Sequence, residues 1–458
     1  MPPRNSLARG LATAFLAGPW DAREMSVRAC RALGFSGTRG WVTRLAKRAC
    51  ATFLPAPPRL DILVRWMSVD GALRRALRRH GEKEPLILDT LTLPPPQMNP
   101  APGIPAEWDL PQLVTPGQLM EWLGLTGGEL DWFADMHGRE RRRPPGALRH
   151  YRYRWIAKPA GGGRMIEAPK ARLKSIQRRV LHDLLDRIVP HDAAHAFRPG
   201  RSIAGFVAPH AGQRVVLHVD LRNFFPSIAA SRVHALFRTV GYPEAVARIL
   251  TGLCTNSAPD EAVPTPCESF SAERRQELDR LYGSPHLPQG SPTSPAIANL
   301  CAHRLDARLC GLARKTNARY TRYADDLVFS GDEELARMLP RFRVWVCAIA
   351  LDEGFPIRHR KTRVMLRNGR QEVSGVIVNE RPNVPRADYD RIKAILTNCR
   401  RHGPASQNRE ASPRFREHLL GRIAYVGMLN PSRGERLREL FDRIEWDERT
   451  ANGEPRTV

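Results

Sequence analysis

The sequence is poor in cysteine, in acids and in long apolar runs, and each scarcity argues against a class of protein. Its eight cysteines include no Cys-x-x-Cys pair and have no histidine cluster beside them, unlike a zinc ribbon or finger. Scattered single cysteines in a chain of 458 residues are typical of buried thiols in a reducing compartment. No uninterrupted apolar run reaches membrane-spanning length. A zinc module and a membrane-spanning protein are therefore not expected.

Acids are outnumbered by bases. The chain has 47 Asp and Glu against 72 Lys and Arg, which gives a formal net charge of +25. Charge of one sign at this level repels itself, and a polyanionic partner relieves that repulsion. Nucleic acid is the first candidate and an anionic membrane surface is the second. A basic protein without a dedicated polyanion is the plainer alternative.

The first 107 residues differ in composition from the rest. Residues 1–90 are rich in Arg and Ala and predict a basic, mostly helical extension, with an organellar transit peptide as the alternative. Six prolines between positions 94 and 105 predict an extended linker over residues 91–107. A membrane-surface or effector-docking arm is a further hypothesis for residues 1–90.

Local signals predict individual elements in the remainder. Thr115 begins one short helix, and Thr126 with Glu129 forms a capping box for a second. Apolar periodicity and a Ser-Pro cap predict helices over residues 173–189 and 295–312. Further predicted elements are two strands within 151–168, a polar insertion at about 255–285, and basic helices near 386–401, 412–428 and 432–447.

Three acids stand at the ends of predicted strands. The β-branched run Val215–Val219 predicts a buried strand ending at Asp220, and residues 318–330 predict a hairpin with Asp325 and Asp326 at its turn. Carboxylates there are costly to bury without a positive partner. Two Mg²⁺ ions bridged by such carboxylates can stabilise the attacking and leaving oxygens of a phosphoryl transfer. An ordinary β-turn, in which Asp is common, is the plainer alternative.

Four motifs, in order, carry a resemblance to reverse transcriptases. Tyr323–Asp326 (YADD) resembles the Y-x-D-D signature, and Asp220–Ile228 (DLRNFFPSI) resembles the first catalytic block. Leu287–Pro295 (LPQGSPTSP) resembles the block beneath the incoming nucleotide, and Gly354–Thr362 resembles the block that follows. The resemblance implies RNA-directed DNA polymerase activity and an α+β right-hand polymerase fold. Such a fold has fingers and palm, built from an antiparallel sheet plus helices, and a helical thumb.

Further segments resemble bacterial retron enzymes in particular. Phe197–Ile203 (FRPGRSI) resembles their F-x-x-G-x-S-I segment, and Val373–Gly375 (VSG) resembles their V-T-G block with Ser for Thr. Their N-A-x-x-H signature is present only in part, because Phe-Val replaces Asn-Ala before His210. The segment from Leu110 to Phe133 resembles the front of myxobacterial-type retron enzymes. The resemblance covers about residues 108–447.

The resemblance implies roles for the acids and for the sugar pocket. Asp220, Asp325 and Asp326 would be catalytic and would bind two Mg²⁺ ions. The Leu221 carbonyl would be an additional ligand. Phe225 would lie against the nucleotide sugar, where its ring would clash with a 2′-OH and favour deoxynucleotides.

Five further residues are expected around the nucleotide. Gln289 and Gly290 would allow close approach of the backbone to the base pair. Lys361 could donate a proton to pyrophosphate. Lys158 and Arg164, on either side of a glycine turn, could grip the triphosphate from the fingertip. A solvated surface lysine and an ordinary basic hairpin are the plainer alternatives.

Basic side chains on the C-terminal helices are expected to grip the backbone of a nucleic-acid duplex. Salt should weaken such contacts. A solvated helix face is the alternative explanation for part of this charge. The side chains are Arg391, Lys393, Arg400, Arg401, Arg416 and Arg422.

The retron resemblance also implies an organisation and a reaction. The predicted domains are a helical lead-in and fingers over 108–213, a palm over 214–380 and a thumb over 381–450. The enzyme would use dNTPs to copy part of a dedicated, structured noncoding RNA into a branched RNA–DNA hybrid (msDNA), priming from an internal guanosine 2′-OH. It would act in the bacterial cytoplasm, in antiphage defence, with a possible separate effector protein.

Two other functions remain open on the sequence. A group II intron or diversity-generating reverse transcriptase would have the same palm and a different RNA, although no maturase-like or HNH-like tail follows the predicted thumb. A catalytically idle RNA-binding scaffold is less expected, because all three acids are present.

Overall fold

The structure is a computed structural model that describes residues 4–53, 57–80, 86–89, 96–157, 163–263 and 271–446. It divides into two compact units, Met1–Gln97 and Met98–Val458. Within the described ranges, no helix is both long and apolar enough to cross a membrane.

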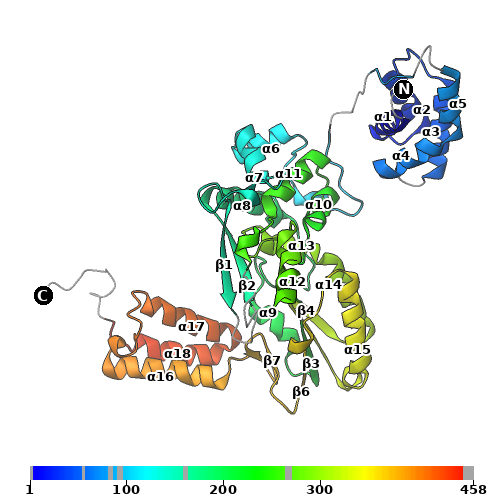
Figure 1. Ribbon diagram of the computed structural model, residues 1–458. Coiled ribbons are helices and arrows are strands. Elements are labelled where there is room, and N and C mark those ends of the chain that lie inside the picture. Colours follow the sequence, from blue (N-terminus) through cyan, green and yellow to red (C-terminus); the bar gives the residue numbers. More distant parts are fainter. Residues whose placement is uncertain are drawn as a thin grey trace. The chain divides into compact units, whose positions relative to one another are not determined.

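The first unit is built from helices around a core of its own (Figure 1). Leu11, Phe15, Met25, Leu45 and Leu63 are fully buried in that core. Its helices are α1 (Arg4–Leu16), α2 (Ala22–Ala32), α3 (Gly40–Thr52), α4 (Leu60–Val69) and α5 (Gly71–His80). The described residues between 4 and 80 therefore form a packed helical unit, and the prediction of mostly helical structure is confirmed for them.

The second unit begins with two short capped helices and a long hairpin. Helices α6 (Pro116–Leu123) and α7 (Gly127–Ala134) each start with a complete capping box, at Thr115 and Thr126. The sequence predicts the box at Thr126 and a helix start at Thr115. The short turn η2 (Glu140–Arg142) follows. Strands β1 (Tyr151–Ala157) and β2 (Gly163–Pro169) then pair antiparallel.

A four-stranded antiparallel sheet organises the middle of the unit. Its strands are β3 (Val215–Asp220), β4 (Arg319–Tyr323), β5 (Asp326–Gly331) and β6 (Arg363–Leu366), in the order β4-β5-β3-β6. Alternate residues of β3 enter two different cores. Val215, Leu217 and Val219 pack with helix α15 (Glu333–Asp352), while Val216 faces the C-terminal helices. Because β3 is covered on both sides, it is held in the centre of the unit.

Helices and short turns surround this sheet. They are α8 (Ala171–Asp183), η3 (Leu185–Arg187), α9 (Ile203–Val207), η4 (Ala208–His210), α10 (Ala230–Thr239), α11 (Glu244–Cys254), η5 (Asp260–Ala262), α12 (Ala272–Gly283), α13 (Ser294–Cys301), α14 (His303–Lys315) and η6 (His359–Lys361). A two-stranded hairpin, β7 (Glu372–Val373) and β8 (Val376–Ile377), leads to the last helices.

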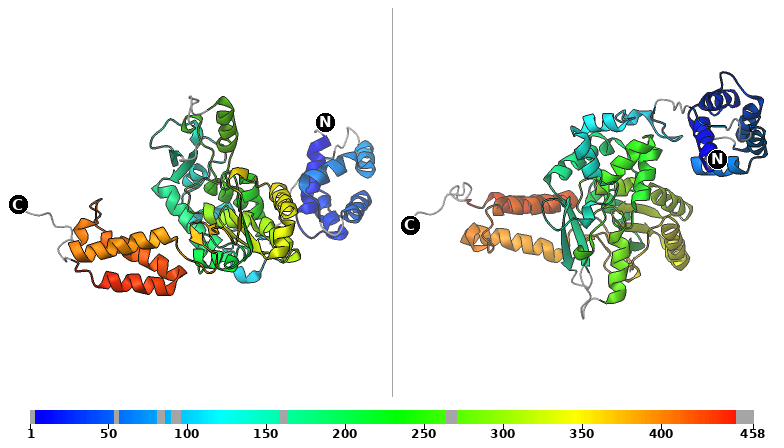
Figure 2. Two further views of the ribbon diagram at one scale, coloured as in Figure 1. Left: turned by 90° about the horizontal axis from the view of Figure 1, so that it is seen from below. Right: turned by 45° about the horizontal axis from the view of Figure 1, so that its top comes forward.

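The last three helices pack together as one bundle, here called the thumb helices (Figure 2). They are α16 (Arg386–His402), α17 (Phe415–Leu429) and α18 (Pro431–Asp442), with the turn η7 (Pro404–Ser406) between the first two. Gly434 of α18 lies so close to α17 that a Cβ there would be 2.3 Å from the Cα of Gly427. Two glycines thus set the distance between α17 and α18.

Two predicted helices have different ends in the structure. The helix predicted over 173–189 stops at Asp183, and a tighter turn keeps Leu184 and Ile188 in the same core. The helix predicted over 295–312 is two helices separated at Ala302. The Arg232 guanidinium donates to the Cys301 carbonyl at 2.8 Å, beside the break between the two helices.

Candidate active site

The three predicted catalytic acids meet at one end of the sheet. Strands β3 and β5 pair so that Asp220 lies directly opposite Asp326. The Leu221 N–H donates to the Asp325 carbonyl at 2.9 Å, which ties the β4–β5 turn to the end of β3. Ala324 adopts a positive φ of 55° within that turn. Residues about 100 positions apart in sequence thus form one cluster of carboxylates.

Asp325 is the carboxylate least suited to ionise. Burial raises its pKa, and the nearby charges of Asp326 and Asp220 raise it further. A buried carboxyl beside two like charges is stabilised as an anion only by a cation. The negative charge around Asp325 therefore favours the binding of a cation beside it.

Asp326 is held as an anion by its neighbours. Burial opposes its ionisation, but hydrogen bonds from His218 Nε2 and Ser374 Oγ, both 2.8 Å long, lower its pKa overall. His218 escaped the sequence analysis, although its position two residues before Asp220 puts both side chains on one face of β3. Ser374 belongs to the VSG motif, and the structure brings that motif to the acid.

Asp220 is almost fully buried, at 2% exposure, and one of its oxygens lacks a hydrogen-bond partner among the described residues. Its Oδ2 accepts from the Lys361 ammonium at 2.7 Å, and Arg358 Nε lies 3.6 Å from Oδ1. Oδ1 makes no hydrogen bond with any described residue. Lys361 thus lies at the acid cluster itself. A role at the triphosphate would require its ammonium to leave Asp220.

The donor set fits a divalent cation. Three carboxylates converge, Asp220 Oδ1 has no hydrogen-bond partner among the described residues, and the pKa of Asp325 is raised by burial and like charge. In the described ranges, no three acid, His or Cys side chains are already arranged around a metal position. Hard oxygen donors of this kind suit Mg²⁺ better than soft metals.

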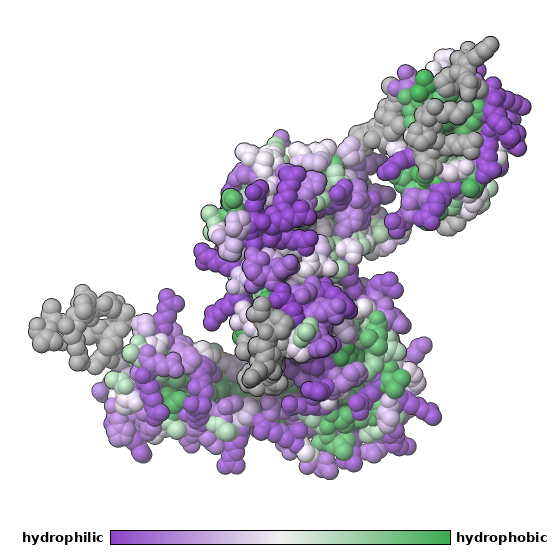
Figure 3. Space-filling view, viewed as in Figure 1, coloured by the Kyte–Doolittle hydropathy of each residue, from purple (hydrophilic) through white to green (hydrophobic). Residues whose placement is uncertain are grey.

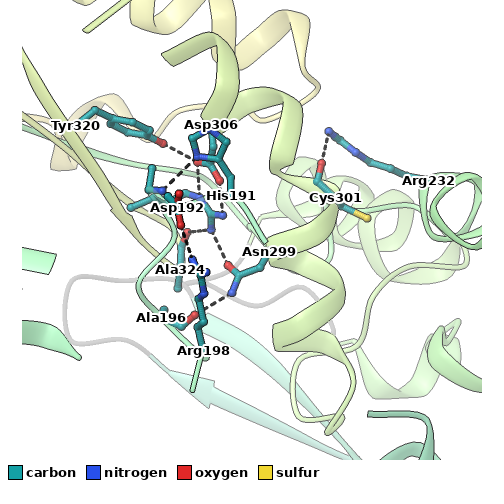
Figure 4. Close-up of polar contacts among 12 residues, drawn as sticks. His191, Asp192, Ala196, Arg198, Arg232, Asn299, Cys301, Asp306, Tyr320 and Ala324 are labelled. Carbon is teal, nitrogen blue, oxygen red and sulfur yellow. Dashed lines mark hydrogen bonds and ion pairs between the residues drawn. The ribbon is translucent and has the colours of Figure 1, made fainter. Parts of the chain in front are cut away.

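A buried arginine supports the turn that carries the acids, and three residues that it contacts, Asp306, Asn299 and Ala324, lie close together in Figure 4. Arg322 is fully buried and pairs with Asp306 through two hydrogen bonds of 2.7 and 2.8 Å. Its Nη1 also donates to Asn299 at 3.0 Å and to the Ala324 carbonyl at 3.1 Å. The sequence did not predict this pair. The only sign of it there is a charged residue inside the predicted strand, just before Tyr323.

The predicted sugar-pocket residue lies among aromatic rings. Phe225 is half-buried, with ring centroids 5.6 Å from Phe224 and 6.3 Å from Phe197. Phe197 is 51% exposed and has a positive φ of 55°. The retron-like FRPGRSI segment thus contributes a ring beside Phe225, a contact that the sequence did not predict.

Gln289 and Gly290 contact the β1–β2 hairpin. The Gln289 carbonyl accepts from the Glu167 N–H of β2 at 2.9 Å. Gly290 has a φ of 138°, and a Cβ there would lie 2.8 Å from the Glu167 carbonyl oxygen, so only glycine fits without displacement. Arg164, further along β2, is exposed. Lys158 lies outside the described residues.

The six predicted duplex-binding side chains lie on the thumb helices. Five are exposed and Arg422 is half-buried. The Arg416 guanidinium lies 6.0 Å from the centre of the Trp446 ring. Within the described part of the chain, none of the six forms an ion pair with an acid, so their charge is available to a partner.

The chain is similar to known proteins over most of its length. Residues 156–418 match the family model described as reverse transcriptase (RNA-dependent DNA polymerase). The chain is 41% identical over 336 residues to the retron Mx65 reverse transcriptase of Myxococcus xanthus, covering 72% of each chain. It is 35% identical over 360 residues to the retron Mx162 reverse transcriptase of the same organism, covering 76% of this chain and 70% of that one. A foamy viral protease-reverse transcriptase in complex with double-stranded DNA matches 67% of this chain and 43% of its own, at 13% identity and a TM-score of 0.34.

Proposed function

Because the chain belongs to the retron branch of the reverse transcriptase family, and is therefore an RNA-directed DNA polymerase, we propose that it copies one dedicated RNA into a branched RNA–DNA hybrid. The fold is the α+β right-hand polymerase fold of that family. Fingers over 108–213, palm over 214–380 and thumb over 381–450 remain our proposed boundaries.

The observation that carries the proposal is the acid cluster at the end of β3 and β5. Polymerases of this family depend on divalent metal. We assign two Mg²⁺ ions to Asp220, Asp325 and Asp326. The Leu221 carbonyl is the proposed further ligand. When bound, the ions lower the pKa of the primer hydroxyl and neutralise the charge that leaves with pyrophosphate.

The chain's own residues prepare this site. His218 and Ser374 hold Asp326 in one orientation and keep it ionised. The Arg322 guanidinium holds the Ala324 carbonyl and thereby the turn that carries both acids. The Lys361 ammonium, which donates to Asp220 in this structure, would have to leave that carboxylate in order to donate a proton to the leaving pyrophosphate.

Other residues are proposed to select and hold the substrates. Phe225 would exclude a 2′-OH by its bulk. Gln289 and Gly290 would lie against the nascent base pair. Lys158 and Arg164 would hold the triphosphate, and the six basic side chains of the thumb helices would hold the duplex.

The biological setting is also a proposal, and the resemblance to retron enzymes supports it. We propose that the hybrid serves antiphage defence, with a possible separate effector protein, in the bacterial cytoplasm. All seven described cysteines are free thiols, which suits a reducing compartment.

Primer extension on an RNA template tests the acid cluster. Asp325→Asn should reduce the extension rate at least about a hundredfold, because the lost carboxylate is worth several kcal/mol of charge stabilisation. Asp131→Asn, on the exposed side of α7, is the matched control and should extend like wild type. Equal rates for wild type and Asp325→Asn would refute the assignment of the site.

A further inference from the structure

The structure contains a basic groove outside the acid cluster. Two adjoining cavities of about 710 and 640 Å³ share Arg149, Pro259 and Glu261 in their walls. One wall comes from the segment between α7 and β1, and the other from η5. The basic side chains that line the groove are Arg141, Arg142, Arg143, Arg149, Arg152 and Lys170. None of them belongs to the four-stranded sheet or to the residues proposed for catalysis.

Arg149 is the feature that points to a ligand. It is only 5% exposed, and its Nε and Nη1 atoms lack a hydrogen-bond partner among the described residues. Its Nη2 pairs with Glu261, which is itself 52% exposed. A buried guanidinium with two unused donors is costly unless an acceptor reaches it. Arg149 lines both cavities, so its positive charge lies in the wall that they share.

The walls of the groove are fixed by local hydrogen bonds. The His150 N–H donates to the Glu140 carboxylate at 2.6 Å, and the Lys170 ammonium donates to the Gly146 and Ala147 carbonyls at 2.5 and 3.2 Å. Two backbone N–H groups, at Arg139 and Glu140, donate to the Asp135 carboxylate. Four of the six basic side chains, Arg141, Arg142, Arg143 and Arg149, therefore belong to a loop that several hydrogen bonds hold in place.

The charge balance of the groove selects an anion. Against the six basic side chains stand Asp260 and Glu261 in the walls and the buried Glu140 behind them. Guanidinium groups bind phosphate through paired N–H donors. The half-buried Tyr153 also lines the groove. Proteins that bind single-stranded nucleic acid combine basic and aromatic side chains in this way. Figure 3 shows hydrophilic side chains gathered where α7 and α8, the helices next to this segment, lie.

We infer that this groove binds the phosphate backbone of an RNA strand outside the primer–template duplex. The inference rests on the proposed function, because a dedicated RNA needs contacts beyond those that any template would make. The groove would hold part of that RNA while the acid cluster copies another part.

The test compares two double variants of the full chain. Arg142→Gln/Arg143→Gln removes two exposed charges from the groove, and Arg341→Gln/Arg343→Gln removes two exposed charges from α15. The probe is a fluorescent RNA hairpin with a single-stranded arm, titrated at several salt concentrations. The groove variant should bind about tenfold more weakly than the α15 variant, with a log–log salt slope shallower by about 1.4, as expected for two lost phosphate contacts.

A third variant gives an effect of opposite sign. Asp260→Asn removes a negative charge from the groove wall and should tighten RNA binding. Equal affinities for the two double variants, or weaker binding by Asp260→Asn, would overturn the proposal. Loss of a copurifying acidic protein with unchanged RNA binding would overturn it too.

Primer extension by wild type distinguishes a failure of the groove assignment from a failure of the proposed function. If wild type extends a preformed RNA template–DNA primer and the double variants bind RNA equally, the groove assignment alone fails. If wild type does not extend, the proposed function fails, and the binding comparison still decides whether the groove binds RNA.

Discussion

At the scale of single residues, Asp325 and Asp326 differ in electrostatic state although they are neighbours. Burial and like charge raise the pKa of Asp325 above its ordinary 3.8, whereas His218 and Ser374 lower that of Asp326. A raised carboxyl pKa means that the folded, metal-free protein loses stability as the pH rises from about 4 through the folded pKa. A lowered pKa contributes stability above the unfolded value, and that stability is lost as the pH falls through the folded pKa.

Asparagine at the two positions should therefore have opposite effects without metal. In EDTA at pH 7, Asp325→Asn should raise the urea midpoint, and the gain should shrink towards pH 4. Asp326→Asn should lower the midpoint at pH 7, because it loses its charge-assisted hydrogen bonds. Urea denaturation across this pH range measures both effects. Shifts of the same sign at pH 7 would contradict the electrostatic account.

Arg322 and Asp306 form a buried pair that should act as a unit. Arg322→Met leaves Asp306 as a buried, unpaired charge and should cost about 3–5 kcal/mol of unfolding free energy. Arg322→Met with Asp306→Leu should recover most of that stability. The double variant should remain slow in primer extension, because the Ala324 carbonyl still lacks its donor. Urea denaturation measures the stability of each variant, and primer extension measures whether the turn still holds the acids in place. If the stable double variant extended a primer as fast as wild type, Arg322 would not be needed to support the turn.

Phe225 should determine the choice between deoxy- and ribonucleotides. Phe225→Ala removes the ring that would clash with a 2′-OH, so discrimination against ribonucleotides should fall about ten- to a hundredfold. Single-nucleotide incorporation of dNTP and rNTP measures the ratio, and the dNTP rate is the internal control. An unchanged ratio would assign the ring to packing with Phe197 and Phe224 alone.

At the scale of elements, the sequence predicted those helix starts and strand ends that depend on interactions between neighbouring residues. The helix starts at Thr115 and Thr126 and the strand ending at Asp220 depend on neighbouring residues, and all three were predicted. The break between α13 and α14 lies where Arg232, about 70 positions away, binds the Cys301 carbonyl, and no local pattern signals such a contact. The pairing of Lys361 with Asp220 was not predicted for the same reason, because the two residues are far apart in the sequence.

The close packing of α17 and α18 gives a prediction for the thumb helices. Gly434→Ala would place a Cβ 2.3 Å from Gly427 and should separate the helices, lowering both the melting temperature and the affinity for primer–template. Gly421→Ala is the matched control, because a Cβ there meets no atom within 4 Å. It should be neutral or stabilise α17 by up to about 1 kcal/mol. Equal melting temperatures for the two variants would argue against tight packing.

At the scale of the whole molecule, the chain joins two units with separate cores. The first unit buries its own apolar side chains, so the second should fold without it. A chain of residues 98–458 should therefore extend a supplied primer–template at a rate close to that of the full chain. Loss of extension by a folded truncation would show that residues 1–97 take part in polymerisation. Comparing proteins captured by the two chains tests whether the first unit is a docking arm.

The central claim is that the acid cluster of this chain copies one dedicated RNA. Sequencing the nucleic acid that copurifies with the protein from its native host tests it most directly. Wild type should carry a single RNA joined to its DNA copy through a branch, and Asp325→Asn should carry the same RNA without DNA. Bulk cellular RNA on wild type, or the same DNA copy on Asp325→Asn, would contradict the claim.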